Sequence, residues 1–350
     1  MIRIQNIYYM LSYAFKALRG QGYKELGAEE FENTGELCAA ILCRGVGLQL
    51  KRGLHREYIS RTEPMSAVRG KIDLTKSLKT QSVQRHQLVC SYDEFSAGCM
   101  LNRILRSTME LLLHADISRK QKKELRNLLV YFRDAEPVDL RRMDWNIRFD
   151  KNNETYRMLI GICCLAAKGL LQTQADGTLK LMDFLDEQRM SRLYEKFILE
   201  YYRRHYPDLC AEASRIPWAL SGGGGDFLPA MQTDVTLQRG GTVLIIDAKY
   251  YDQAMQVHFD RHTVHSANLY QIFAYVKNRD YSFGDSPHTV SGMLLYAKTD
   301  EAVQPDAVYQ MSGNRISVGT LDLNQDFLKI AGQLDAIAQE HFKGIEKKSN

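Results

Sequence analysis

The feature that most constrains the fold is the segment at residues 231–251, MQTDVTLQRGGTVLIIDAKYY. Gly240 and Gly241 can supply the positive φ values of a tight turn, so this pair predicts a hairpin between two antiparallel strands. The second strand, 242–246, is apolar and mostly β-branched, which is typical of a central strand. The segment therefore predicts a sheet that is buried on both faces.

Two charged residues, Asp247 and Lys249, end this apolar strand. Burying either charge without a partner would cost several kcal/mol, so we expect a metal ion or a substrate to meet them. The period-two alternation of a strand places both side chains on one side, and the hairpin brings Asp234 alongside. Two carboxylates and one ammonium group are predicted to converge on one point.

This combination of groups predicts phosphodiester hydrolysis that depends on Mg²⁺. Carboxylate oxygens suit Mg²⁺, which also accepts phosphate oxygens. The bound ion can lower the pKa of a water molecule and offset charge that develops on the phosphate. Lys249 would orient or deprotonate that water, or stabilise the pentacoordinate phosphate. The structural alternative is an ion pair of Asp247 with Lys249 at a strand end, with Asp234 a solvated hairpin residue.

The spacing of these residues also carries a family resemblance. Asp234, followed by the tripeptide Asp247-Ala-Lys249 and then by Gln271-Ile-Phe-Ala-Tyr275, resembles the PD-(D/E)xK nuclease superfamily with its Q-x3-Y helix. The resemblance covers roughly residues 187–300. It implies that Asp234 and Asp247 are metal ligands and that Lys249 is the catalytic lysine.

The resemblance assigns roles to three further residues and departs from the superfamily pattern at one. Glu195, in a preceding helix, would be an additional carboxylate near the metal, directly or through water; the alternative is an exposed residue paired with a neighbouring lysine or arginine. Gln271 and Tyr275 lie four residues apart, hence on one helical face, where both could reach the active site or a phosphate. Core packing is the alternative for Tyr275. Thr233 stands where the superfamily name places proline.

A narrower resemblance extends over most of the chain. The segments IRIQNIYYMLSYAF at 2–15, VRGKIDL at 68–74 and YDEFSAGCMLNRIL at 92–105 resemble the McrC-type nuclease subunit of the McrBC modification-dependent restriction systems. This implies a subunit that docks onto a ring of AAA+ GTPase motor subunits of the McrB type and stimulates their GTPase. It also implies that the carboxy-terminal half cuts DNA methylated at cytosine, a modification that the motor subunits recognise. The resemblance gives the two halves these separate roles, and the sequence pattern puts the boundary between them within 172–185. We therefore expect a partner-binding and regulatory domain at 1–180 and an endonuclease domain at 181–350.

The order of apolar patterns predicts a mixed α/β (α+β) chain. We expect an amino-terminal helical domain with a small sheet, then a nuclease core with a central mixed sheet flanked by helices. The expected helices begin at the amino terminus and then cover 36–42, 100–131, 156–170, 188–206 and 266–277. The expected strand-rich regions are 48–79, 209–251 and 289–297.

Several function classes are disfavoured by what the sequence contains. The glycine run 222–225 lacks the Lys-Ser/Thr ending of a phosphate-binding loop, and no such loop occurs elsewhere, so we expect no nucleotide hydrolysis by this chain. Seven cysteines without zinc-ligand spacing indicate reduced core residues. The longest apolar stretch, 158–167, is about half the roughly 20 residues of a bilayer span, and no signal peptide is evident, so we expect a cytoplasmic protein without membrane contact.

Two groups of residues suggest further contacts with DNA or a partner. His258, His262 and His265 lack zinc-ligand spacing, so a mobile, DNA-facing loop is favoured over a metal site. The middle of the first half of the chain is rich in basic residues. These residues could face DNA phosphates, present a residue to a motor's nucleotide site, or simply form solvated strand faces. They are Arg44, Lys51, Arg52, Arg56, Arg61, Arg69, Lys71, Lys76 and Lys79.

Three functional hypotheses follow from the sequence. The leading one is an endonuclease subunit of a GTP-driven restriction complex, which predicts little cutting by the chain alone. The second is a free-standing repair or structure-specific nuclease, which would cut with Mg²⁺ unaided. The third is a non-catalytic adaptor that activates a GTPase motor. Cleavage assays with and without a GTPase partner discriminate among them.

Overall fold

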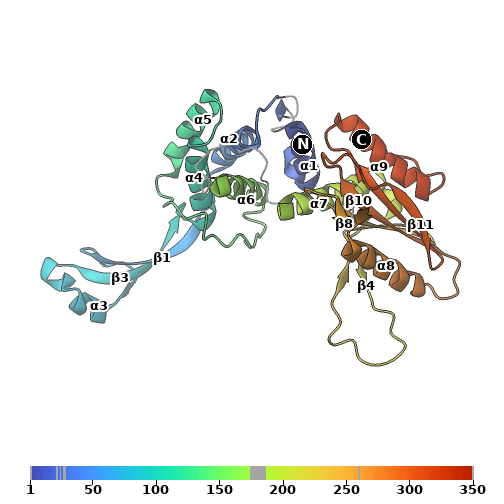
Figure 1. Cartoon of the computed structure of the whole chain (residues 1–350). Coiled ribbons are helices and arrows are strands. Elements are labelled where there is room, and N and C mark those ends of the chain that lie inside the picture. The colour runs from blue at the N-terminus through green and yellow to red at the C-terminus, as the bar shows by residue number, and fades with distance from the viewer. Residues whose placement is uncertain are drawn as a thin grey trace. The chain divides into compact units, whose positions relative to one another are not determined.

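The computed structural model describes residues 2–20, 23, 25–26, 29–173, 187–258 and 261–348, and the chain divides into two compact units (Figure 1). Unit 1 contains Met1–Gly20 together with Leu185–Asn350, and unit 2 contains Gln21–Phe184. The expected mixed α/β class is confirmed. The division after residue 184 lies near the expected boundary at 180, but the first twenty residues pack with unit 1 and not with unit 2.

The first helix joins unit 1 through specific side-chain contacts. Helix α1 (Ile4–Ala14) packs along α7 (Glu187–His205), where Tyr13 Oη lies 2.8 Å from His205 Nε2. The Asn6 amide donates at 2.7 Å to the backbone carbonyl of Leu323, near the start of α9 (Phe327–His341). Because the two partners of each contact are separated by more than 190 residues in the sequence, local sequence patterns give no sign of these contacts.

Unit 2 has a helical body. Its helices are α2 (Thr34–Arg52), α4 (Met100–Leu113), α5 (Arg119–Leu129) and α6 (Tyr156–Thr173). The helix expected over 100–131 is therefore interrupted, because Ser118 accepts a hydrogen bond from Gln121 N at 3.3 Å and caps a new helix. Helix α2 also extends into the region expected as strand and ends at Gly53, whose φ is +91°.

A three-stranded antiparallel sheet projects from this helical body (Figure 1). Its strands are β1 (Glu57–Met65), β2 (Lys71–Ile72) and β3 (Leu88–Ser96), in the order β1-β3-β2, with α3 (Leu74–Lys79) between β2 and β3. We call residues 57–96 the β arm. The small sheet expected over 48–79 is present, although one of its strands lies beyond that range and α3 replaces part of it.

Hydrogen bonds at the root of the β arm join it to the helices. Tyr156 Oη donates to Asn102 Oδ1 at 2.8 Å, and Asn102 Nδ2 donates to the carbonyls of His55 and Ala97 at 2.8 and 2.7 Å. Those two carbonyls flank the arm on either side. One buried asparagine therefore joins both chain segments at the base of the arm to α4 and α6.

Unit 1 is built on a mixed five-stranded sheet with the order β11-β12-β10-β7-β6. Strand β10 runs parallel to β7 and β12, whereas β6 and β11 pair antiparallel with their neighbours. The predicted central position of the apolar strand is confirmed, because β7 lies between β10 and β6. The strands are β6 (Val235–Arg239), β7 (Thr242–Lys249), β10 (Thr289–Ala297), β11 (Ala307–Met311) and β12 (Asn314–Leu321).

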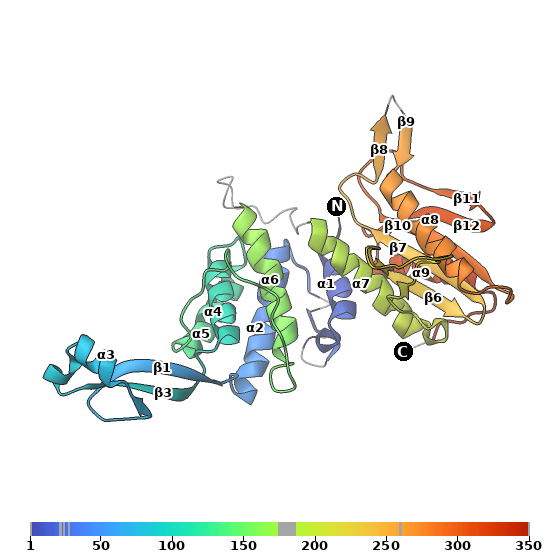
Figure 2. The ribbon, with the colours of Figure 1, turned by 90° about the horizontal axis from the view of Figure 1, so that it is seen from below.

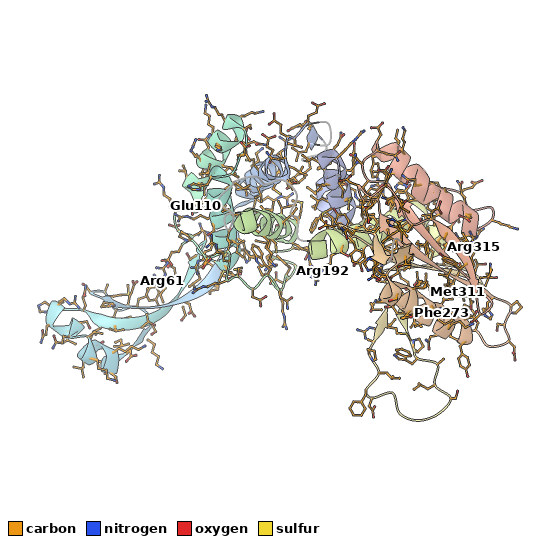
Figure 3. The ribbon with its side chains drawn as sticks, viewed as in Figure 1. Arg61, Glu110, Arg192, Phe273, Met311 and Arg315 are labelled. Atoms are coloured by element: carbon orange, nitrogen blue, oxygen red, sulfur yellow. The ribbon has the colours of Figure 1, made fainter. Side chains whose placement is uncertain are left out.

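Helices cover this sheet so that β7 is buried on both faces. Val243 and Ile245 belong to one apolar cluster with Ile272 of α8 (Ser266–Tyr281). Leu244 and Ile246 alternate with them and are fully buried on the opposite side. Figure 2 shows α8 running along the sheet beside β10 and β7.

The turn between β6 and β7 uses its two glycines differently from the prediction. Gly240 has φ +59°, as expected, but Gly241 is not among the glycines with positive φ. A Cβ atom at Gly241 would lie 2.6 Å from the carbonyl oxygen of Pro287, so this position needs glycine for a close backbone approach.

Two short hairpins accompany the main sheet. One pairs β4 (Arg215–Ile216) with β5 (Met231–Gln232), and the other pairs β8 (Met255–His258) with β9 (Arg261–Val264). The prediction of a loop around the three histidines is therefore wrong, because residues 255–258 and 261–264 pair as strands. Across the described residues, we find no helix with the length and apolar character needed to span a membrane.

Candidate active site

The hairpin brings the two predicted aspartates together at the carboxyl end of β7. Val235 pairs with Ile246 in the antiparallel register, so the next positions along the two chains are Asp234 and Asp247. Asp234 Oδ2 accepts a hydrogen bond from Ala248 N at 2.8 Å. Asp247 is buried, with 2% of its surface exposed.

Thr233 holds the bend that places Asp234. Its side chain is buried, and its hydroxyl accepts from Ser214 N at 2.9 Å and bonds to the Thr236 hydroxyl at 2.9 Å. Its backbone N–H donates to the carbonyl of Ser214 at 3.0 Å. Proline could not make that last bond, so threonine at this position anchors the bend through contacts that proline lacks.

Lys249 lies between an acidic and an amide partner on the face that α8 covers. Its Nζ is 2.8 Å from Asp247 Oδ2, and it donates to Gln271 Oε1 at 3.1 Å. Gln271 Nε2 donates in turn to Tyr275 Oη at 2.8 Å. The predicted convergence of Asp234, Asp247, Lys249 and Gln271 is present, and the ion pair of the structural alternative is part of it.

Tyr275 supports this set from behind. Its hydroxyl donates at 3.0 Å to the backbone carbonyl of Gln232, and the side chain is 7% exposed. Its ring belongs to the apolar cluster between α8 and the sheet. Tyr275 therefore contacts Gln271 and the backbone, and its direct reach to a phosphate stays a prediction.

Burial and mutual repulsion give the acidic groups unusual proton affinities. Burial, the Asp247 carboxylate and the Glu195 carboxylate together raise the pKa of Asp234 to about 8. Burial also raises the pKa of Asp247, although the Lys249 ammonium opposes this change. Burial lowers the pKa of Lys249, but Asp247, Asp234 and Tyr251 together raise it by more, so Lys249 is protonated at neutral pH.

The arrangement fits a small divalent cation. Asp247 Oδ2 is buried and receives no hydrogen bond of good geometry within the described residues, so its contact with Lys249 is an ion pair alone. Two adjacent carboxylates of raised pKa, one buried and one partly buried, would both ionise readily only beside a cation. Asp234 and Asp247 are the residues that could hold such a cation, and carboxylate oxygens suit Mg²⁺.

Glu195 lies near this pair without joining it. It is half-buried, its charge raises the pKa of Asp234, and its Oε1 accepts a hydrogen bond from Ser191 at 2.9 Å. Among the described residues, no three histidine, cysteine, aspartate or glutamate side chains are grouped closely enough to hold a metal ion. The role of Glu195 as a third ligand therefore stays a prediction.

The sequence analysis missed a second chain of hydrogen-bonded side chains beside Lys249. Tyr251 Oη donates to Asn268 Oδ1 at 3.3 Å, and Asn268 Nδ2 donates to Tyr296 Oη at 3.0 Å. Tyr296 pairs with Lys249 in the parallel register of β10 and β7, and burial raises its pKa to about 12. The available signal was that Asn268 precedes Gln271 by three residues, hence on the same helical face.

The structure describes the side chains of two of the three histidines. His262 is exposed on β9, and His265 is the residue that precedes α8. The side chain of His258 lies outside the described residues. Neither their binding of a metal ion nor their contact with DNA is tested by this geometry.

Comparison with known proteins identifies the family. The sequence model described as the McrBC 5-methylcytosine restriction system component matches residues 4–297. The chain belongs to the McrBC family. The matched range of this McrBC component includes all six predicted site residues, and the resemblance drawn from the sequence motifs is confirmed.

One curated relative of this McrBC component aligns over nearly its whole length. It is the type IV methyl-directed restriction enzyme EcoKMcrBC of Escherichia coli (strain K12), 28% identical over 348 residues, which are 98% of this chain and 99% of the relative. The alignment therefore extends through both units.

Two solved structures of Thermococcus gammatolerans are also similar. A half-complex from a tetradecameric assembly of McrB AAA+ hexamers with bound McrC matches with 18% identity and a TM-score of 0.49, covering 95% of this chain and 76% of that chain. The McrBC complex matches with 22% identity and a TM-score of 0.39, covering 57% and 58%.

Proposed function

We propose that this McrBC component is the DNA-cutting subunit of its restriction system, a Mg²⁺-dependent endonuclease with a PD-(D/E)xK site. The observation that carries the proposal is the pair of buried Asp247 and partly buried Asp234 with Lys249 beside it at the end of β7. Gathering one buried and two partly buried ionisable groups at the end of an apolar strand is costly for stability, so a role in chemistry is the better explanation.

Each residue of the site has a role in this proposal. Asp234 and Asp247 would hold Mg²⁺, which supplies an activated water and offsets charge on the phosphate. Lys249 is kept protonated by Asp247 and oriented by Gln271, so it would donate to the phosphate as negative charge develops. The raised pKa of Lys249 favours this role over deprotonation of the water.

We further propose that the chain acts with an AAA+ GTPase motor of the McrB type on DNA that carries 5-methylcytosine. The chain itself lacks a phosphate-binding loop, so GTP hydrolysis must come from a partner. The β arm carries exposed apolar residues suited to docking on such a partner. They are Tyr58, Leu74, Leu78 and Phe95, with exposures of 75, 64, 70 and 53%.

The deciding experiment measures DNA cleavage by the full chain with Mg²⁺, with and without the motor and GTP, on methylated and unmethylated duplexes. Asp247→Asn is the test variant, and Asp326→Asn, an exposed acid paired with Arg3, is the matched control. We expect cleavage only with the motor, GTP and methylation, and only when Asp247 is intact.

Other outcomes of this experiment identify the alternatives. Cutting by the chain alone with Mg²⁺ would support a free-standing nuclease. No cutting by the wild type under any condition, with GTPase stimulation retained, would support a non-catalytic adaptor. If the Asp247→Asn chain cuts DNA as the wild type does, the site assignment is wrong.

A further inference from the structure

A strongly positive surface lies on helix α5 and the turn that follows it, far along the sequence from the proposed active site. Residues 119–133 contain six cations and one acid, Glu124, for a net charge of +5. The whole chain has a net charge of +4, so the remaining residues sum to −1, which is +4 minus +5. The six cations are Arg119, Lys120, Lys122, Lys123, Arg126 and Arg133.

The packing of α5 turns most of these cations outward. Leu125 is fully buried, and Gln121 Nε2 donates to the carbonyl of Glu36 at 2.9 Å, which attaches one face of α5 to α2. Arg119, Lys123 and Arg126 recur at steps of four and three residues on the exposed face. Figure 1 shows α5 at the outer side of the helices of unit 2.

Acids flank this stretch at Asp116 and Asp134, but among the described residues they form no ion pair with its cations. Within the described part of the chain, none of the six forms an ion pair, whereas Arg103 and Arg106 of the neighbouring α4 each pair with a glutamate. The first turn of α5 contains no acidic residue, and Arg119 and Lys120 stand there instead. Cations at a helix amino terminus oppose the helix dipole, so this charge pattern weakens the helix that carries it.

We propose that this α5 surface binds the phosphate backbone of duplex DNA outside the cleavage site. The inference rests on the proposed function, since DNA is its substrate. From Arg119 to Arg126 the helix rises about 10 Å, and duplex DNA carries one charge per ~1.7 Å of its axis. Several phosphates therefore lie within reach of one helix face.

The composition of the surface indicates binding without sequence preference. Lysine and arginine side chains neutralise phosphates and release counterions, which contributes affinity but no base discrimination. Tyr131 and Val130, 65% and 52% exposed at the end of α5, offer adjacent apolar contact. The surface would hold DNA for the nuclease, leaving recognition of the modified base to another component.

The test uses the double variant Lys120→Gln/Lys123→Gln of the full chain. Glutamine has nearly the helix propensity of lysine, so α5 should remain folded, which circular dichroism verifies. Binding to a fluorescent duplex is measured by anisotropy over a range of KCl concentrations, in EDTA and without GTP. We expect weaker binding at low salt and a slope of log K against log salt that is smaller by about 1.8, since each phosphate contact contributes about 0.9.

Two control variants isolate the charge of α5. Lys329→Gln/Lys343→Gln removes two exposed lysines from unit 1 and should leave the slope unchanged. Lys120→Arg/Lys123→Arg keeps both charges and should bind as the wild type does. If the glutamine variant of α5 keeps the wild-type affinity and slope, the proposal is overturned.

The remaining outcomes separate this proposal from its alternative and from the proposed function. If DNA binding is unchanged while stimulation of the motor's GTPase falls, the surface docks an acidic protein and the DNA proposal is wrong. DNA binding is measured without metal, so it does not depend on cleavage. If the cleavage test rejects the nuclease site at Asp247, the salt dependence of binding still decides whether α5 binds DNA.

Discussion

At the residue scale, the geometry around Lys249 follows from the direction of one chain of hydrogen bonds. The Gln232 carbonyl can only accept, so the Tyr275 hydroxyl must donate to it. The same hydroxyl then accepts from Gln271 Nε2, which turns Gln271 Oε1 toward the Lys249 ammonium. Tyr275 is thus a positioning residue that fixes the amide orientation of Gln271.

Replacing Tyr275 with phenylalanine removes this constraint while keeping the ring in its apolar cluster. We expect kcat for DNA cleavage by the assembled system to fall about tenfold, the equivalent of one hydrogen bond of about 1.4 kcal/mol, with KM for DNA little changed. Steady-state kinetics check this. Tyr281→Phe, at an exposed tyrosine of the same helix, is the control. A rise in KM with unchanged kcat would indicate a substrate contact instead.

Asp234 makes the metal-free protein less stable as pH rises. Its pKa is about 8 when folded against 3.8 for the free side chain, so between about pH 4 and pH 8 the folded state keeps a proton that the unfolded state releases. Stability from this group is therefore present at low pH and lost as pH rises through that window.

The variant Asp234→Asn should remove this loss, because asparagine can still accept from Ala248 N but carries no charge. We expect its free energy of unfolding in EDTA to exceed that of the wild type near pH 8 by roughly 1–3 kcal/mol, and by much less near pH 4. Denaturant unfolding at both pH values measures this. Parallel pH profiles for the two proteins would contradict the raised pKa.

At the scale of the element, the β arm depends on a backbone position that only glycine fits. Gly70 has φ +68°, and a Cβ atom there would lie 2.3 Å from the carbonyl oxygen of Ser91 on β3. The backbone just before β2 therefore packs closely against β3, although the arm exposes much of its apolar surface. Under the proposed function, presenting those side chains to the motor requires a folded arm.

The variant Gly70→Ala should disturb β2 and α3 while leaving unit 1 folded. We expect a destabilisation of the arm of about 1–3 kcal/mol, faster proteolysis within residues 66–87, and reduced stimulation of the motor's GTPase. Gly47→Ala is the control, because a Cβ atom at Gly47 meets nothing within 4 Å and alanine favours the helix α2. If Gly70→Ala stimulates the motor's GTPase as the wild type does, the arm does not dock on the motor.

At the scale of the whole molecule, the carboxy-terminal unit includes a helix from the opposite end of the chain. Besides the Asn6 and Tyr13 contacts, the ring of Tyr9 stacks on Phe327 of α9 at 4.5 Å. A buried polar group without its partner costs about 1–3 kcal/mol, so losing α1 would expose an apolar face and leave His205 without the Tyr13 hydroxyl.

We expect residues 185–350 alone to be unstable, and the same residues joined by a flexible linker to residues 1–20 to fold. Thermal unfolding followed by circular dichroism compares the two proteins. In the full chain, Asn6→Ala should lower the free energy of unfolding by about 1–3 kcal/mol, since it leaves the carbonyls of Leu323 and Gln325 without this donor. A stable 185–350 fragment would show that α1 is dispensable.

Local sequence determined the parts of this protein that depend on short-range geometry. The hairpin, the buried strand β7 and the meeting of Asp234, Asp247 and Lys249 follow from a turn, an alternation and a register within twenty residues. Helices α7 and α8 were likewise predicted close to their observed bounds. The break between α4 and α5 was missed, because one capping serine outweighs the continuing apolar pattern.

Only the tertiary structure decided the features that join distant segments. The place of α1 in unit 1, the polar chain from Tyr251 through Asn268 to Tyr296, and the raised pKa of Asp234 all depend on groups far apart in sequence. Burial and pairing between such groups are set by how the elements pack, and period and spacing carry no information about that packing. The sequence therefore determined which side chains gather at the end of β7, and the tertiary structure decided their protonation and their support.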